Sequence, residues 1–420
     1  MTHNLAELYT ARRNRLAEQI GAGIALINSA GVAPDPLLFD KNLHYLTGLS
    51  CKKATLLLAP NAVTVDYWDT IHGPEVGRGH RVTELLFVEE RSEREAYIDG
   101  AGDSFDDIRA RTGVQAVYNL DRMNEFLTRS LMREKVLWFN SPSIPSLDRP
   151  LSAKLTAIKQ LRERFYWLDF RNIAPLIHDM RWIKEPYEIE CLRRAFALHA
   201  EIYKKLMRTL KPGVNEAVGH ALFEHEVRLQ GPEFTFGLDL YDASIIVAAG
   251  KNAAVAHYMA NDQDIVDGDL VLIDSGVICN GYSSDITTTF PANGRYSRRQ
   301  RELYEIVLAA QKKAIATMKP GATQFDAHKA VYDHFDQHGL AQYNYGRCGH
   351  PVGLNIHDAN GDPDKPLEPG VVLVIEPFLV IPEENIGIRI ESGVLVTADG
   401  HELLPDAPKE IDEVEAICSA

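Results

Sequence analysis

Two segments in the C-terminal part of the sequence repeat one pattern, and this repetition constrains the fold more than any other feature. Residues 268–274 read Gly-Asp-Leu-Val-Leu-Ile-Asp and residues 370–376 read Gly-Val-Val-Leu-Val-Ile-Glu. A long helical pattern ending in Lys-Pro-Gly precedes each copy, as does a histidine. Two copies are too few for a solenoid. They predict a duplicated α/β half that folds face to face around one site; chance similarity between buried strands is the alternative.

An Asn-Gly pair follows the first copy and predicts a β-hairpin. Asn280-Gly281 between two β-like runs is the strongest short-range signal for such a turn. With these two residues as the loop, Asp274 faces Thr287. Asp285 lies two residues from Thr287, and alternate side chains of a strand share a face. A hairpin without a bulge therefore places Asp274 and Asp285 on the same face.

These two carboxylates need a cationic partner. Close together on an apolar hairpin, they repel each other and lose hydration, so we expect a cation between them. A metal ion is the simplest such cation. The alternative is a pair of solvated surface aspartates, which the apolar flanking runs 271–273 and 286–290 disfavour.

Two further carboxylates end β-like runs. Glu376 follows the apolar run 371–375 and precedes Pro377, which stops regular strand pairing there. A buried carboxylate in this position needs a partner. In residues 386–391 the isoleucines alternate with Gly387, Arg389 and Glu391, so Arg389 and Glu391 share the less apolar face. A simple surface Arg–Glu pair is the alternative for this segment.

Two histidines complete the set of candidate ligands. His350 and His357 lie in a segment rich in glycine and proline, where a helix is disfavoured. On a strand, a spacing of seven residues puts their rings on opposite faces. We therefore predict that one is a metal ligand and that the other contacts the substrate or transfers protons. Four carboxylates and one imidazole suit Mn²⁺ or a similar ion. Two close ions can share a hydroxide and polarise a carbonyl, which predicts hydrolysis of a carbonyl compound.

The domain organisation follows from the order of predicted elements. Residues 1–20 form an amphipathic helical pattern, β-rich runs occupy 23–30, 54–60 and 63–69, and residues 127–140 indicate a helix and then a strand. After a predicted strand at 166–170, Pro186 begins a helix to about Leu210, and a second long helix covers 298–318. We therefore predict an N-terminal α/β domain over 1–172 and a catalytic domain over 173–420.

Charge and composition exclude several classes of protein. The net charge of −15 disfavours a main role on nucleic acid or anionic membranes. No apolar stretch reads as a secretory signal or a membrane span. The five cysteines are odd in number, scattered and without a CxxC pair, which is typical of a reduced compartment. We expect a cytoplasmic protein.

The ordered motifs resemble those of the proline-specific "pita-bread" metallopeptidases, the Xaa-Pro aminopeptidases (aminopeptidase P) and the prolidases. The C-terminal strings that carry the resemblance are 178–184, 188–195, Asn252 with His257-Tyr258, 274–287, 349–358, 375–377 and 387–391. Arg12-Arg13 and residues 45–48 resemble the creatinase-like N-terminal domain of the same enzymes. The resemblance therefore covers nearly the whole chain.

The resemblance implies a fold and a site. The fold would be α+β, with a C-terminal pita-bread domain of pseudo-twofold halves after a smaller α/β domain. Two divalent ions, Mn²⁺ with Co²⁺ or Zn²⁺ as alternatives, would be held by Asp274, Asp285, His350, Glu376 and Glu391, with Asp285 and Glu391 bridging. Glu376 would also handle protons. The substrate side chains would be His257, His357 and Arg389, with the two histidines stabilising the tetrahedral intermediate.

The resemblance implies hydrolysis of an Xaa-Pro bond in a proline-containing peptide, by a homodimer or higher homo-oligomer. Our leading interpretation is an Xaa-Pro aminopeptidase; the alternatives are a prolidase restricted to dipeptides and a non-catalytic peptide-binding homologue. Two departures affect expectations of rate and substrate preference. Gly346 and Arg347 stand where the family commonly has His-Gly, and Thr288 stands where it often has arginine.

Overall fold

The computed structural model describes residues 4–29, 40–50, 53–65, 80–140, 150–151, 153–237, 245–344, 346–359 and 362–420. The chain divides into two compact units, Met1–Met180 and Arg181–Ala420. The boundary predicted near residue 172 lies at the end of strand β6 (Asp169–Asn172), just before helix α7 (Ala174–Trp182), in which the division falls.

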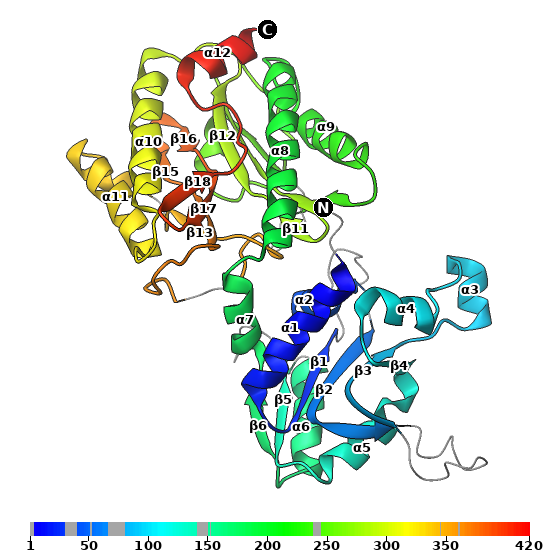
Figure 1. Ribbon diagram of the computed structural model, residues 1–420. Coiled ribbons are helices and arrows are strands. Elements are labelled where there is room, and N and C mark those ends of the chain that lie inside the picture. The colour runs from blue at the N-terminus through cyan, green and yellow to red at the C-terminus, as the bar shows by residue number, and fades with distance from the viewer. Residues whose placement is uncertain are drawn as a thin grey trace. The chain divides into compact units, whose positions relative to one another are not determined.

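A mixed sheet organises the first unit, with its described strands in the order β4-β3-β2-β1-β5-β6 (Figure 1). The strands are β1 (Ile24–Asn28), β2 (Ala54–Val65), β3 (His80–Val88), β4 (Ala116–Asn119), β5 (Val136–Phe139) and β6. β2 pairs antiparallel with β1 and β3, and the other pairs are parallel. The runs predicted separately at 54–60 and 63–69 join in β2, whose pairing is irregular between Leu58 and Val63. Residues 66–69 lie outside the described residues.

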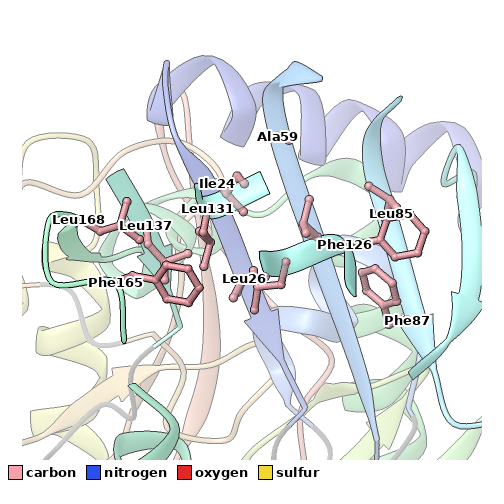
Figure 2. Packing of buried hydrophobic residues seen from close by; sticks show 12 residues of the cluster. Ile24, Leu26, Ala59, Leu85, Phe87, Phe126, Leu131, Leu137, Phe165 and Leu168 are labelled. Carbon is pink, nitrogen blue, oxygen red and sulfur yellow. The ribbon is translucent and has the colours of Figure 1, made fainter. Parts of the chain in front are cut away.

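Helices and a buried apolar cluster complete this unit. The helix predicted in residues 1–20 is confirmed as α1, and the helix and strand predicted over 127–140 are confirmed as α5 and β5. The helices are α1 (Leu5–Ile20), α2 (Lys41–Thr47), α3 (Glu93–Asp99), α4 (Phe105–Thr112), α5 (Met123–Leu131) and α6 (Ala153–Arg164). Figure 2 shows Phe126 of α5 beside Leu85 and Phe87 of β3 in the apolar cluster.

The Arg12-Arg13 pair has a structural role in this unit. Both arginines are buried. Arg12 donates to the carbonyl of Tyr45 at 2.9 Å and stacks over its ring at 3.9 Å, while Arg13 pairs with Glu84 at 3.0 Å. Because each buried cation has a partner, these residues hold α1 against α2 and the sheet.

The second unit is built from two halves, each of which begins with two helices that are followed by strands (Figure 1). The first half contains α8 (Pro186–Thr209), α9 (Glu216–Arg228), β7 (Phe234–Phe236), β8 (Ile245–Ala249), β9 (Leu270–Ser275), β10 (Val277–Cys279), β11 (Tyr282–Ser283) and β12 (Ile286–Pro291). The second contains α10 (Arg298–Thr317), α11 (Gln324–Gln337), β13 (Gly349–Pro351), β14 (Val372–Ile375), β15 (Phe378–Ile381), β16 (Ile386–Arg389), β17 (Ser392–Thr397), β18 (Gly400–Leu403) and α12 (Ile411–Ser419).

The predicted duplication is visible in this arrangement. Each half begins with two helices, and each places its carboxylate-ended strand between two antiparallel partners. β9 lies between β8 and β12, and β14 lies between β13 and β17. The predicted helix beginning at Pro186 is confirmed as α8, with Pro186 in its first turn, and the predicted helix 298–318 is confirmed as α10.

The predicted hairpin register is confirmed. Asp274 pairs with Thr287, and Cys279 pairs with Tyr282 across the turn. Asn280 and Gly281 have φ values of +48° and +89°, the left-handed conformation that a two-residue turn between twisted strands requires. The same register holds on both sides of the break between β9 and β10.

The described cysteines are free and buried: Cys191, Cys279, Cys348 and Cys418. Cys51 lies outside the described residues. None of the helices in the described parts of the chain combines the length and hydropathy that a bilayer crossing requires.

A buried ion triad holds the loop that carries His357. Asp358 is 2% exposed and contacts both Arg181 and, at 3.3 Å, Lys184. Burial alone would raise the pKa of Asp358, but the two cations outweigh it and lower that pKa to about 2. Its backbone N–H donates to Pro351 at 2.9 Å, so the triad also fixes the end of β13.

We expect Asp358→Asn to lower the free energy of unfolding by about 3–5 kcal/mol, because it leaves two buried cations without a counter-charge. Since the folded pKa is depressed, the stabilisation by Asp358 is present above about pH 4 and is lost as the pH falls toward 2. Denaturant unfolding of the metal-free protein at several pH values measures both effects. Asp333→Asn is the control, because its pair with Lys329 is exposed and should contribute less than about 1 kcal/mol.

Candidate metal centre

The hairpin carries two buried carboxylates. Asp274 lies in β9 and Asp285 lies immediately before β12, and they are 9% and 4% exposed. Burial raises the pKa of Asp285 well above its usual range, and the neighbouring charges of Glu391, Asp274 and Glu376 raise it further. The four carboxylates predicted from three separate motifs therefore gather in one place.

Backbone and side-chain hydrogen bonds from β12 bring Glu391 to this hairpin. The Thr287 hydroxyl donates to Glu391 Oε2 at 2.7 Å, and the Glu391 N–H donates to the Thr287 carbonyl at 3.0 Å. Thr289 likewise donates to the Arg389 carbonyl at 2.8 Å. The sequence interpretation did not assign Thr287 to the site, although the hairpin register placed it opposite Asp274. The predicted pairing of Thr287 with Asp274 across the hairpin is the signal that could have identified Thr287 as a site residue.

His350 adds an imidazole to the carboxylates. Its Nε2 atom lies 3.5 Å from Asp285 Oδ2 and 3.6 Å from Glu376 Oε1. Ligand atoms of Asp285, His350 and Glu391 all lie within 4.8 Å of one another. Burial, with the adjacent His357, lowers the pKa of His350 to about 3. His350 is therefore neutral at physiological pH, which is the form that binds a metal ion.

Unused hydrogen-bond capacity is concentrated among these carboxylates. Among the described residues, Asp274 Oδ1, Asp285 Oδ1 and Glu391 Oε1 are buried and accept no hydrogen bond. A buried charged oxygen without a partner is costly. Hard oxygens from carboxylates beside one neutral imidazole are the donors that divalent ions such as Mn²⁺ prefer. The residues present therefore fit a divalent metal centre.

Arg389 compensates part of the negative charge. Its Nη2 atom lies 2.5 Å from Asp274 Oδ2, and its Nε donates to Thr287 at 3.3 Å. Arg389 and Glu391 are both buried and the guanidinium contacts Asp274, which rules out the alternative of a simple surface Arg–Glu pair. Burial raises the pKa of Glu376 to about 7; Arg389 opposes this shift and Asp274 adds to it. A carboxyl with such a pKa can both accept and release a proton near neutrality.

The predicted placement of His350 and His357 on opposite faces of one strand is wrong. β13 ends at Pro351, and His357 lies in the following loop rather than on a strand. The two rings pack side by side, with centroids 4.0 Å apart. They differ in exposure, since His350 is partly buried and His357 is exposed. The different roles predicted for them therefore depend on access to solvent and not on strand geometry.

His257 lies on a loop that Glu216 anchors. Burial lowers the pKa of His257, as does the nearby charge of Arg389, while the charge of Asp274 opposes the shift. Arg389 also donates to the Ala256 carbonyl at 3.1 Å. Buried Glu216, the first residue of α9, accepts hydrogen bonds from Ala249 N–H, Asn252, Tyr258 and Gln263 N–H.

Sequence reasoning missed Glu216, because a glutamate at the start of a helix is usually a surface residue. Asn252 and Tyr258, polar residues of the motif that includes His257, could have indicated a buried acidic partner such as Glu216.

Gly346, which stands where the family commonly has histidine, has a backbone conformation that favours glycine. Gly346 has φ +89°, a conformation that L side chains rarely adopt. A histidine there would strain this loop, so the local conformation matches the glycine found in this chain. The other departure, Thr288, is fully buried, and its hydroxyl makes no hydrogen bond within the described residues.

Comparisons with known proteins point to one family. "Metallopeptidase family M24" matches residues 190–398, and "Aminopeptidase P, N-terminal domain" matches residues 9–138. Human Xaa-Pro aminopeptidase 3 is 32% identical over 410 residues, which cover 90% of this chain and 76% of the human protein. The Xaa-Pro dipeptidase of Pyrococcus furiosus is 33% identical over 257 residues, 60% of this chain and 72% of that protein. The solved structure of Pseudomonas aeruginosa aminopeptidase PepP matches with a TM-score of 0.80 at 28% identity, covering 98% of this chain and 97% of that one.

Proposed function

The chain belongs to the aminopeptidase P and prolidase family of pita-bread metallopeptidases, and on that premise we propose that it is an Xaa-Pro aminopeptidase. It hydrolyses the peptide bond before a penultimate proline and releases the N-terminal residue. The observation that carries this proposal is the group of buried, unpaired carboxylate oxygens from both halves beside neutral His350. The similarity to human Xaa-Pro aminopeptidase 3 covers 90% of the chain, whereas that to the dipeptidase covers 60%, which favours the aminopeptidase over the prolidase.

The residues that would hold two divalent ions are Asp274, Asp285, His350, Glu376 and Glu391, with Asp285 and Glu391 shared between them. We propose Mn²⁺ as the native ion, with Co²⁺ and Zn²⁺ as alternatives, because oxygen donors dominate the set. Such ions, when bound, lower the pKa of water and polarise a carbonyl.

The protein side chains supply proton transfer and orientation. Glu376 takes the proton of the attacking water as the water oxygen bonds to the carbonyl carbon, and then delivers a proton to the leaving proline nitrogen. The exposed imidazoles of His257 and His357 donate N–H groups toward the developing oxyanion and the substrate carbonyl. Arg389, held by Asp274 and Thr287, keeps the His257 loop in place through Ala256.

The preference between peptide lengths tests the aminopeptidase against the prolidase. We expect the purified, Mn²⁺-loaded protein to cleave Xaa-Pro-Yaa tripeptides with a higher kcat/KM than Xaa-Pro dipeptides. Cleavage confined to dipeptides would assign it as a prolidase. Metal binding without turnover of either substrate would favour the non-catalytic peptide-binding homologue.

The number of bound ions tests the proposed ligand set. Five ligands with shared carboxylates predict about two divalent ions per chain. Elemental analysis after dialysis against Mn²⁺, combined with a calorimetric titration, gives this number. A chain that binds none with its five ligands intact would overturn the catalytic proposal.

We also propose a cytoplasmic homodimer or higher homo-oligomer. The absence of paired cysteines among the described residues supports the reducing compartment. The oligomeric state rests on the family resemblance and can be measured by light scattering on the eluted protein.

A further inference from the structure

A buried histidine lies directly behind the first pair of carboxylates. His199 of α8 is fully buried, and its Nε2 and Nδ1 atoms lie 2.9 Å from Ser275 Oγ and 3.0 Å from Ser284 Oγ. Ser275 follows Asp274 in sequence, and Ser284 precedes Asp285. One imidazole therefore joins the two strands of the hairpin at the residues adjacent to both candidate ligands.

The surroundings of His199 define the charge of its ring. Burial, with the charge of Lys409, lowers the pKa of His199 to about 3, so the ring is neutral. Ser275 Oγ also lies 2.9 Å from the Tyr203 hydroxyl, which donates to the Ile286 carbonyl at 2.7 Å. A neutral imidazole has one N–H and one acceptor nitrogen, so His199 donates to one of the two serines and accepts from the other. This donor-and-acceptor bridge is specific to a neutral imidazole at this position.

A buried glutamine makes the corresponding bridge in the second half. Gln311 of α10 is 1% exposed, and its Nε2 atom donates to the carbonyls of Ile375 and Ile390 at 3.0 and 2.9 Å, and contacts Ser392 Oγ at 3.0 Å. Ile375 precedes Glu376 in sequence, and Ile390 and Ser392 flank Glu391. One amide therefore joins the two segments that carry the second pair of candidate ligands.

The two bridges occupy equivalent positions in the duplicated fold. His199 stands thirteen residues after Pro186, the first residue of α8, and Gln311 stands thirteen residues after Arg298, the first residue of α10. Figure 1 draws the central strands of this unit between these two helices. We propose that His199 and Gln311 are paired positioning residues that fix the spacing of the metal-binding carboxylates, one in each half. This proposal rests on the proposed metal centre.

The physical reason lies in the precision that a dinuclear site needs. Four carboxylates repel one another, so the segments that carry them tend to separate unless another contact restrains them. Groups behind the ligands commonly set ligand orientation, and their loss costs about 10–100-fold in metal affinity. A residue that merely fills the core would affect unfolding and leave metal affinity unchanged.

The test removes each bridge and keeps its volume. His199→Phe and Gln311→Met retain bulk but cannot make the bridging hydrogen bonds. We expect each to raise the Kd for Mn²⁺ by about 10-fold or more, measured by calorimetry on the metal-free protein. The double variant should also lose the electron paramagnetic resonance signal of a spin-coupled Mn²⁺ pair. His199→Gln, whose amide both donates and accepts, should recover part of the affinity and is the variant to measure if His199→Phe does not fold.

Matched controls separate positioning from packing. Leu206→Ala in α8 and Leu303→Ala in α10 remove fully buried apolar side chains from the same helices. They should lower the thermal midpoint at least as much as the bridge variants but leave the Kd for Mn²⁺ within about 2-fold. Equal effects of controls and bridge variants on this Kd, or an unchanged Kd in the bridge variants, would overturn the positioning role alone. A wild-type chain that binds no Mn²⁺ would overturn the proposed function and this proposal with it.

Discussion

Asp285→Asn is expected to abolish both metal occupancy and peptidase activity. Asp285 is proposed to be shared by both ions, and its Oδ1 atom is buried and accepts no hydrogen bond within the described residues. An amide of the same shape lacks the negative charge. Loss of a group that only orients a metal ligand already lowers metal affinity or activity by about 10–100-fold. Loss of a shared ligand itself should therefore lower kcat/KM by more than about 100-fold. Elemental analysis and the tripeptide assay measure the two effects on one sample.

The stability of the same variant provides the internal control. Burial and three neighbouring carboxylates raise the pKa of Asp285, so its ionised form destabilises the metal-free fold at neutral pH. Metal-free Asp285→Asn should therefore melt no lower than the metal-free wild type. Asp267→Asn, an exposed aspartate just before β9, should retain both metal and activity. Full activity in Asp285→Asn would show that this hairpin does not carry the metal.

Local patterns predicted the elements that bear the candidate ligands. The Asn280-Gly281 turn requires two left-handed residues, and that requirement alone fixed the pairing of Asp274 with Thr287. The limits of α8 followed from Pro186 at its start and the Lys-Pro-Gly sequence beyond its end, because both signals act within a few residues. The repeated glycine and carboxylate offsets predicted a duplicated α/β half, and each half indeed begins with two helices followed by strands.

Contacts between distant segments could not be predicted in the same way. The parity argument for His350 and His357 assumed a strand through both, but β13 ends at Pro351, where Asp358 folds the loop back. The alternation of residues 386–391 predicted that Arg389 and Glu391 share a face, but it gave no sign that Arg389 contacts Asp274 of the other half. Glu216 gave no local signal, because the groups that it binds lie 33 to 47 residues away in the sequence.

His357→Ala is expected to keep its metals and its fold but to turn over Xaa-Pro substrates about 100-fold more slowly. An N–H donor used mainly in the transition state lowers kcat when removed and changes substrate binding less. His357 is exposed and therefore accessible to substrate, whereas Nε2 of His350 faces Asp285 and Glu376. His350→Ala should instead lose metal affinity outright. Steady-state kinetics and Mn²⁺ titration of both variants distinguish the two roles.

The contact between the two rings requires one more variant. Because the rings of His350 and His357 pack at 4.0 Å, His357→Ala also removes support from His350, and a loss of metal could follow from packing alone. His357→Phe keeps an aromatic ring in that place and removes both nitrogens. If His357 acts as a donor, the Phe variant binds Mn²⁺ normally and is as slow as the Ala variant. If the Phe variant recovers full activity, His357 acts by supporting His350. Loss of metal in both His357 variants, with normal binding in His350→Ala, would reverse the assignment, because the ligand would then be the exposed imidazole.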